Sequence, residues 1–278
     1  MLPISYGMAE YYLNNKPLSD FGIIPSKDGG SIAITGGFDL PKRSGTTFYN
    51  WPLENSVDAY VDADDITFEN REIKFTGTIL GNANNNINAL HNYIDSLPVL
   101  SELSCKWGSW EVKIQKQIII TPIDRNNSKI EIIFTEPSPN LTGTLPLPSD
   151  KNEIDNYSWL DFGLWIESIS GGQNIGAYKI LNVTQNKTHT LPYSGGRDKT
   201  EITINANFLC KTFHEFISKV KSLYSLLGNS GLRKIKYRGI EYTCFVVNGF
   251  NISNIIIRNI VSAKFQCKLI VVGKNGIL

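Results

Sequence analysis

The chain has 278 residues, 41% of them hydrophobic and 11% aromatic, and its formal net charge is +1. This suffices for one large or two ordinary globular domains with an apolar core. No run approaches the roughly 18 apolar residues that span a bilayer, and residues 1–7 lack the basic and apolar regions of a secretory signal. We therefore expect no signal peptide and no membrane-spanning helix. The cysteines, Cys105, Cys210, Cys244 and Cys267, form no C-x-x-C pair, which predicts free buried thiols in a reducing compartment.

A short pattern near the start of the chain returns in its second half. Residues 18–23 read LSDFGI, and residues 159–164 read WLDFGL, 141 positions later. Asp-Phe-Gly is also the magnesium-binding word of protein kinases, but the sequence holds none of the other kinase motifs. The pattern therefore predicts a structural turn that occurs twice.

The elements that follow each copy come in the same order. Residues 72–79 predict a strand, and residues 87–97 carry apolar side chains at helical spacing. In the second copy a strand over 201–208 leads into a helix that begins after Thr212. Glu215 completes a capping pattern with Thr212, and Gly228 is a suitable stop.

Both copies close with a hairpin and apolar strands. The hairpins, at 107–112 and 237–242, each contain a glutamate, Glu111 and Glu241. Alternation in the final strand places one set of side chains toward a core. This set is Val261, Ala263, Phe265, Cys267 and Leu269, and the closing strands are expected at 117–120, 128–134, 254–257 and 261–272.

These patterns predict a mainly β (α+β) protein of two tandem β-barrel or β-sandwich domains, each with one flanking helix. The first domain covers 1–135 and the second 157–278, and the second copies the plan of the first by internal duplication. Residues 136–156 form an extended linker, since four prolines fall within 136–150. The alternative is two unrelated β domains that share common turn sequences.

Charge differs between the two halves. Residues 1–150 hold 11 Lys and Arg against 18 Asp and Glu, a net charge of −7, while 151–278 hold 16 against 8, a net charge of +8. Similar domains of opposite charge can attract head to tail, so alternating them around a ring would bring acidic against basic surface. The alternative is two solvated surfaces whose charges diverged independently.

No residues suggest a catalytic, metal or cofactor site. His91, His189 and His214 show no metal-binding spacing, and the acidic stretch 58–65 lacks the glycine and glutamate of an EF-hand loop. The basic segment 232–238 could follow a phosphate backbone or contact an acidic neighbour. We assign no site residues, and the binding residues stay unknown.

Three segments in order resemble the N-terminal region of phage distal tail proteins. They are residues 11–23, which contain Leu18-Ser19-Asp20-Phe21-Gly22-Ile23, residues 36–45, which contain Pro41-Lys42-Arg43-Ser44-Gly45, and residues 65–73, which end in Arg71-Glu72-Ile73. The resemblance covers about 11–135 and, through the repeat, more loosely 157–272.

The resemblance implies a tail-tube-like β domain with one flanking helix that forms six-fold rings around the channel through which DNA leaves. Here a second copy follows in place of a galectin-like or carbohydrate-binding module, as in baseplate hub proteins, where two tube-like domains let a trimer present pseudo-six-fold symmetry. The implied protein is a virion component with no cofactor, assembled in the host cytoplasm. Its implied partners are itself, as a trimer or hexamer, the tail tube protein, tail-tip or receptor-binding proteins and, in passage, DNA.

Two other classes of function stay open. A carbohydrate-binding β-sandwich would use exposed aromatic side chains, for which the candidates are Trp51, Trp107, Trp110, Trp159 and Trp165. A hydrolase would need a deep pocket with converging carboxylates, for which residues 62–65 are the weak candidates. We expect no enzyme.

Overall fold

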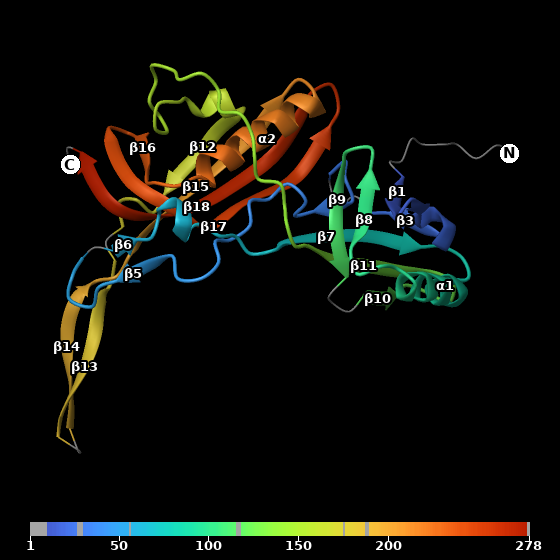
Figure 1. Ribbon diagram of the computed structural model, residues 1–278, viewed down its shortest axis with the longest axis horizontal. Helices are drawn as coiled ribbons and strands as arrows, with labels where there is room; N and C mark the ends of the chain where they lie inside the picture. Colours follow the sequence, from blue (N-terminus) through green and yellow to red (C-terminus); the bar gives the residue numbers. More distant parts are fainter. Residues whose placement is uncertain are drawn as a thin grey trace. The chain divides into compact units, whose positions relative to one another are not determined.

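A computed structural model describes residues 10–26, 30–55, 57–114, 118–174, 176–186 and 189–276. The first residues of the chain and Gln117, at the start of a predicted strand, lie outside this described part. The protein is mainly β, with curled sheets and two α-helices among the described residues, as the sequence predicts (Figure 1). None of the described helices has the length and apolar character needed to cross a membrane.

The chain forms two compact units, and neither is continuous in sequence. Unit 1 consists of Met1–Asp39, Asn70–Asn140 and Ile252–Ala263, and unit 2 consists of Leu40–Glu69, Leu141–Asn251 and Lys264–Leu278. The first part of the chain therefore contributes Leu40–Glu69 to unit 2, and the last part contributes Ile252–Ala263 to unit 1. The predicted continuous domains, 1–135 and 157–278, stay a prediction.

Unit 1 is built on a sheet of nine strands whose main path runs β2-β1-β8-β9-β11-β7-β3, with β10 paired to β11 and β4 paired to β7. The strands at 72–79 and 128–134 and the helix at 87–97 are confirmed as β7, β11 and α1. The elements are β1 (Tyr11–Leu13), β2 (Lys16–Pro17), η1 (Leu18–Phe21), β3 (Ile23–Pro25), β4 (Ile34–Thr35), β7 (Arg71–Ile79), α1 (Ala83–Asp95), β8 (Ser101–Cys105), β9 (Gly108–Ile114), β10 (Ile119–Pro122) and β11 (Ser128–Glu136).

Unit 2 contains a five-stranded sheet in the order β12-β15-β18-β17-β16 and two separate hairpins, β5-β6 and β13-β14. The hairpins were not predicted, whereas the predicted second helix is α2. The elements are β5 (Phe48–Asn50), β6 (Val57–Ala59), η2 (Ala63–Asp65), η3 (Trp159–Phe162), β12 (Leu164–Ser170), β13 (Tyr178–Asn186), β14 (His189–Arg197), β15 (Thr200–Cys210), α2 (Phe213–Leu227), β16 (Arg233–Tyr237), β17 (Ile240–Ile257) and β18 (Val261–Gly276).

The two sheets share one strand path. The order β3-β7-β11-β9-β8 in the first sheet matches β12-β15-β18-β17-β16 in the second, and in each a helix follows the second strand along the chain. The pairing registers also correspond, because Ile23 lies opposite Ile79 in one and Leu164 lies opposite Phe208 in the other. Duplication of one ancestral unit explains this repetition and stays a prediction.

The repeated Asp-Phe-Gly word is a structural turn in both copies. Each copy is a short 3-10 helix, η1 or η3, and the glycine that ends it has a left-handed backbone, with φ of 68° at Gly22 and 70° at Gly163. Phe21 and Phe162 of the two words are buried. Asp20 and Asp161 are therefore part of these short helices, and among the described residues neither belongs to a group of side chains that could hold a metal ion.

Helix α2 packs on one face of the five-stranded sheet (Figure 1). The Phe216 ring meets the Phe208 ring edge-on with centroids 5.1 Å apart, and the Tyr224 ring stacks on Phe250 at 5.6 Å. The Thr212 hydroxyl accepts from the Glu215 N–H at 3.1 Å, as predicted. The Glu215 carboxylate, however, accepts from the N–H of Lys211, one residue before the predicted partner. The alternating side chains of β18, from Val261 to Leu269, are buried as predicted.

The proline-rich segment is fixed to α2. The Ser225 hydroxyl donates to the Gly143 carbonyl and the Ser222 hydroxyl donates to the Thr144 carbonyl, both at 2.7 Å. A Cβ on Gly143 would lie 2.1 Å from the carbonyl oxygen of Lys221, so the backbones approach closely. The segment is extended, and within unit 2 it lies against the helix.

A second pair of glycines turns the chain after β4 and after β12. Gly36 has φ +83° and Gly171 has φ +87°, and a Cβ on either would fall 2.2 or 2.3 Å from the carbonyl oxygen of Glu72 or Glu201. The next residues, Gly37 and Gly172, lie against the Trp110 and Tyr242 rings. Trp110 and Tyr242 therefore occupy equivalent positions in the two copies. The sequence-based match of Glu111 to Glu241 is wrong, because it is displaced from this equivalence.

Replacing Gly171 with alanine should destabilise the protein more than replacing Gly239. Both glycines lie in unit 2 with positive φ, but a Cβ on Gly239 (φ +77°) meets nothing within 4 Å. Gly239→Ala should therefore lower the free energy of unfolding only by the cost of a positive φ, about 1 kcal/mol. Gly171→Ala should lower it further, because the new Cβ also clashes with the carbonyl oxygen of Glu201. Urea unfolding measures the difference, and equal losses in the two variants would contradict it.

Candidate assembly surfaces

The acidic stretch, His91 and His214 do not come together into a site, and the side chain of His189 lies outside the described part of the structure. The Asp58 carboxylate accepts from the Trp51 indole N–H at 2.6 Å, and Asp64 and Asp65 are exposed in η2. His91 and His214 lie exposed on α1 and α2. Among the described residues no group of His, Cys, Asp and Glu could hold a metal ion.

The basic segment 232–238 is the edge strand β16 and the turn after it, and its charges have partners within unit 2. Arg233 pairs with Asp155 at 3.1 Å, and Lys236 lies 3.7 Å from a Glu241 oxygen. The chain at 153–157 runs along the free side of β16, where the Asp155 N–H donates to the Lys234 carbonyl at 2.7 Å. This edge is covered, which disfavours the use of β16 as a track for phosphates.

The five tryptophans do not form one aromatic surface. Trp110 and Trp159 are buried and Trp107 is half-buried, whereas Trp51 is 41% and Trp165 is 59% exposed. Trp107 and Trp110 belong to unit 1 and the others to unit 2. A platform for sugars built from all five is therefore absent from these residues.

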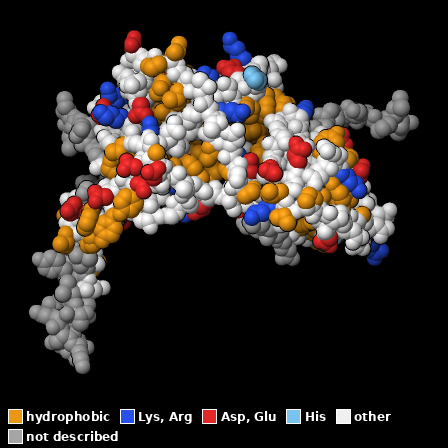
Figure 2. Space-filling view, viewed as in Figure 1, with side chains coloured by type: hydrophobic (Ala, Val, Ile, Leu, Met, Phe, Trp, Pro, Cys, Tyr) orange, Lys and Arg blue, Asp and Glu red, His pale blue; other side chains and the backbone are white. Residues whose placement is uncertain are grey.

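Exposed aromatic side chains do gather near the start of the β13-β14 hairpin. The Tyr49 and Trp51 rings meet edge-on at 4.6 Å, and the Arg197 guanidinium lies over the Tyr178 ring at 4.4 Å. Figure 2 shows hydrophobic side chains beside acidic ones in this part of unit 2. Exposed rings with polar neighbours are common where a protein binds another molecule.

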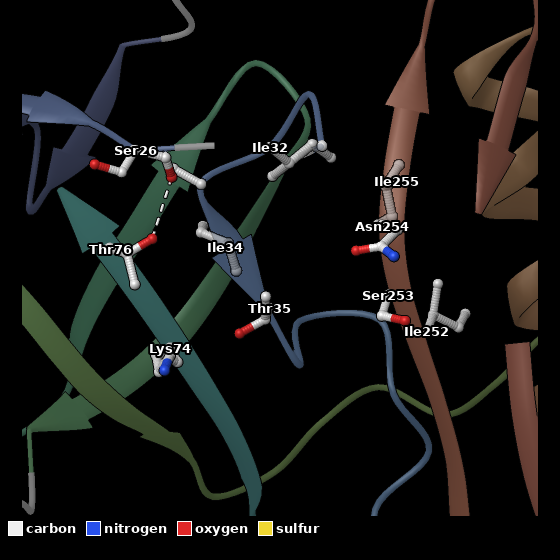
Figure 3. Close-up of a pocket in the computed structure, with 12 residues that line it drawn as sticks. Ser26, Ile32, Ile34, Thr35, Lys74, Thr76, Ile252, Ser253, Asn254 and Ile255 are labelled. Carbon is white, nitrogen blue, oxygen red and sulfur yellow. Dashed lines mark hydrogen bonds between the residues drawn. The ribbon is translucent and has the colours of Figure 1, made fainter. Parts of the chain in front are cut away.

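Unit 1 contains a small cavity, drawn in Figure 3. Its volume is about 150 Å³, and its walls include residues 32–35 on one side and 252–255 on the other. The Thr76 hydroxyl donates to the Ser26 carbonyl at 3.1 Å, and the Lys74 ammonium pairs with Glu131 at 3.0 Å. Thr76 and Lys74 thus already have partners, and no carboxylate is among the described residues that line the cavity, so it does not resemble a hydrolytic site.

A buried polar cluster fixes the tip of the β17-β18 hairpin in unit 1. The Asp39 carboxylate accepts from the Ile252 N–H at 2.7 Å, and the Arg71 guanidinium donates to the Asp39 carbonyl at 3.2 Å. Arg71 also pairs with Glu136 at 2.7 Å, and both side chains are buried. Burial raises the pKa of Asp39 from 3.8 to about 6, although the Ile252 hydrogen bond and Arg71 lower it. Nothing in the local sequence marks Asp39 as buried.

The chain that follows the Gly36–Gly37 turn lies along the outer edge of β17. Leu40 and Phe250 exchange two backbone hydrogen bonds, of 3.0 and 3.2 Å, in an antiparallel bridge, and the Arg43 N–H donates to the Val247 carbonyl at 2.8 Å. Further along, the Ser31 N–H donates to the Ile255 carbonyl at 2.7 Å. This part of β17, beyond the reach of the short strand β16, is therefore paired.

Two other strands are edges of their sheets. β12 ends the five-stranded order, and Trp165 on β12 and Leu209 on β15 are both at least half exposed. β10 pairs with β11, and Ile119 and Ile123 beside this hairpin are 47% and 60% exposed. An edge strand with exposed apolar side chains is a template for pairing with another chain. These edges are the candidate assembly surfaces.

No protein-family model matches the sequence, and no curated protein matches it. Among solved structures, the chain is similar to the SPP1 Dit (gp 19.1) protein, described with its crystal structure as a paradigm of the hub adsorption apparatus in phages that infect Gram-positive bacteria. The sequence identity is 9% and the TM-score is 0.36, over 96% of this chain and 99% of that chain.

Replacing Asp39 with asparagine should make stability less dependent on pH. Because the pKa of Asp39 is raised in the folded state, the folded protein keeps a proton between pH 3.8 and about 6 that the unfolded chain releases. Stability from this group therefore falls as pH rises through that window. Asp39→Asn should be more stable than the natural protein at pH 7, by on the order of 1–3 kcal/mol, and similar below pH 4.

Urea unfolding at several pH values measures this effect. Asp95→Asn, on the exposed surface of α1, controls for the loss of a carboxylate elsewhere. Parallel pH curves for the natural protein and Asp39→Asn would show that the carboxylate is not penalised by burial.

Three of the four thiols should resist modification in the folded protein. Cys210, Cys244 and Cys267 are free and buried, and burial raises the pKa of Cys210 to about 11 and that of Cys267 to about 12. Only thiolates react readily with disulfide reagents. At pH 8 the half-buried Cys105 should react first and the others on unfolding, and a fast phase that persists in Cys105→Ser would contradict this.

Proposed function

We propose that this protein is a structural component of a phage or prophage tail tip, a distal tail or baseplate hub protein. Copies of the chain form a ring that joins the tail tube to receptor-binding or puncturing parts and surrounds the channel for DNA. The protein acts through repeated contacts and not through catalysis, and it resides in the virion tail after assembly in the host.

The repeated strand path carries this proposal. One chain supplies two sheets of the same topology, each with a helix after the second strand of the path. In each unit a segment before the 3-10 helix covers one sheet edge, because β1 pairs with β8 in unit 1 and residues 153–157 follow β16 in unit 2. In unit 2 the β16 edge of the sheet is covered and the β12 edge is open. A subunit with one open sheet edge can add a neighbouring subunit on that side.

The sequence resemblance to distal tail proteins supports the same role. Its three segments lie at turns and at the starts of strands. Residues 18–23 form η1 and the start of β3, and residues 65–73 lead into β7. Residues 36–45 contain the glycine turn and the residues that pair with β17.

Opposite charge in the two halves supports contact between copies. The first 150 residues carry −7 (11 basic, 18 acidic) and the remainder +8 (16 basic, 8 acidic). Copies joined first half to second half gain Coulomb attraction, which salt weakens over a Debye length of about 8 Å at physiological ionic strength. Three copies would supply six units for one ring, and six copies would make two layers.

The purified protein should behave as a trimer or hexamer in light scattering coupled to size exclusion. Its molar mass should fall toward that of the 31.1 kDa monomer as salt is raised, because screening weakens the attraction between oppositely charged halves. Negative-stain electron microscopy of the same fractions should show rings with a central opening.

A monomer at every concentration and salt would count against a self-assembling ring. Glycan binding by such a monomer, lost in Trp51→Ala, would instead favour the carbohydrate-binding alternative, since Trp51 and Tyr49 are exposed in unit 2. Trp165→Ala is the matched control, because Trp165 is exposed in the same unit on a different sheet.

A further inference from the structure

The outer edge of β17 shows how a sheet edge in this fold is covered. The chain turns at Gly36, the Asp39 N–H donates to the Gly36 carbonyl at 3.1 Å, and the Asp39 side chain then accepts the outward N–H of Ile252. Antiparallel pairing of Leu40 with Phe250 follows directly. A glycine turn thus places a side-chain acceptor three residues later, and this acceptor binds an outward-pointing backbone N–H of the strand edge. We call this arrangement a cap of the edge.

Unit 2 contains the same turn without the strand that it would cap. Gly171 corresponds to Gly36, and the Asn174 N–H donates to the Gly171 carbonyl at 2.9 Å, as Asp39 does to Gly36. Asn174 therefore stands at the position of Asp39, with an amide oxygen in place of the carboxylate. Its side chain is exposed, and no hydrogen bond joins it to the described residues.

Unit 1 contains the corresponding strand edge without the cap. β9 and β10 lie beside β11, as β17 lies beside β18. The Ile123 N–H donates to the Asn127 carbonyl at 2.9 Å across the β10-β11 turn. Because bonded and non-bonded pairs alternate in an antiparallel ladder, the N–H of Ile120 points away from β11. Pro122, the other outward residue of β10, has no N–H to donate.

We propose that these two unfilled positions bind each other in neighbouring copies of the chain. The segment 171–174 of one copy lies along the outer edge of β10 in a second copy, and the Asn174 side-chain carbonyl accepts the N–H of Ile120. The contact uses the geometry by which Asp39 holds Ile252. It rests on the self-association in the proposed function and names the surfaces through which it occurs.

Charge and exposure fit this occupant. The donor strand lies in the first half of the chain, which carries −7 (11 basic, 18 acidic), and the acceptor lies in the second half, which carries +8 (16 basic, 8 acidic). Ile119 and Ile123, exposed at β10, would be covered by a paired segment. The two surfaces differ, so the contact is head to tail, and such contacts generate a ring when the rotation closes.

Site-specific cross-linking tests this contact. The variant carries Asn174→Cys and Ile120→Cys in a Cys105→Ser background, and the purified protein is treated with a short bismaleimide. We expect dimers and higher covalent species on denaturing gels, with peptides containing positions 120 and 174 joined in mass spectra. The matched control replaces Ile120→Cys with Asn84→Cys, on the exposed first turn of α1.

A second variant measures the hydrogen bond without a cross-linker. Asn174→Ala removes the acceptor and should weaken self-association up to about tenfold, the loss expected for one exposed hydrogen bond. Ser170→Ala, at the exposed end of β12 before the turn, is its control and should leave the association unchanged.

The outcomes distinguish the contact between residues 171–174 and β10 from the wider proposal that copies of the chain form a ring. An oligomer in light scattering that gives no more cross-linking than the Asn84→Cys control would overturn this contact and leave ring formation standing. A monomer without cross-links at high protein concentration and low salt would overturn both. Cross-links between 120 and 174 in the oligomer, together with weaker association of Asn174→Ala, would support the contact.

Discussion

Every strand at the edge of a sheet presents backbone donors and acceptors that need partners, and the organisation of this protein follows from how it meets that need. β1 closes the β8 edge, residues 153–157 close the β16 edge, and the chain at 39–43 closes the outer part of β17. In a chain with so many short strands, few partners are sequence neighbours. The fold is therefore held by pairings that cross long stretches of sequence, and the edges left over define where other molecules can add.

Local patterns in the sequence were sufficient for the elements whose stability is local. Thr212 and Gly228 bound α2, alternation marked β18, and the repeated Asp-Phe-Gly words marked η1 and η3. In these cases a cap, a face or a positive φ is decided by residues a few positions apart. The same patterns also predicted a mainly β chain with one helix in each half.

The features that the sequence did not reveal depend on distant partners. The bridge from Leu40 to Phe250 spans most of the chain, and no local signal at either residue announces it. Asp39 reads as an ordinary loop carboxylate until Ile252 and Arg71 surround it. The match of Glu111 to Glu241 was wrong because identical letters attracted the alignment, whereas packing against Gly37 and Gly172 shows that Trp110 and Tyr242 occupy the same place. Two of the five tryptophan candidates for a sugar site, Trp110 and Trp159, are core residues for a similar reason, since their burial depends on the side chains that pack around them.

The discontinuous composition of unit 1 has a consequence for the order of events during protein synthesis. Its last segment, Ile252–Ala263, is translated long after β7, α1 and β11 have left the ribosome. Until then the Asp39 carboxylate cannot accept its hydrogen bond from the Ile252 N–H. The wall of the cavity formed by residues 252–255 is also missing. Domains that are continuous fold as they emerge, but this unit must wait for nearly the whole chain. A nascent chain thus cannot complete the first unit until translation has passed residue 263.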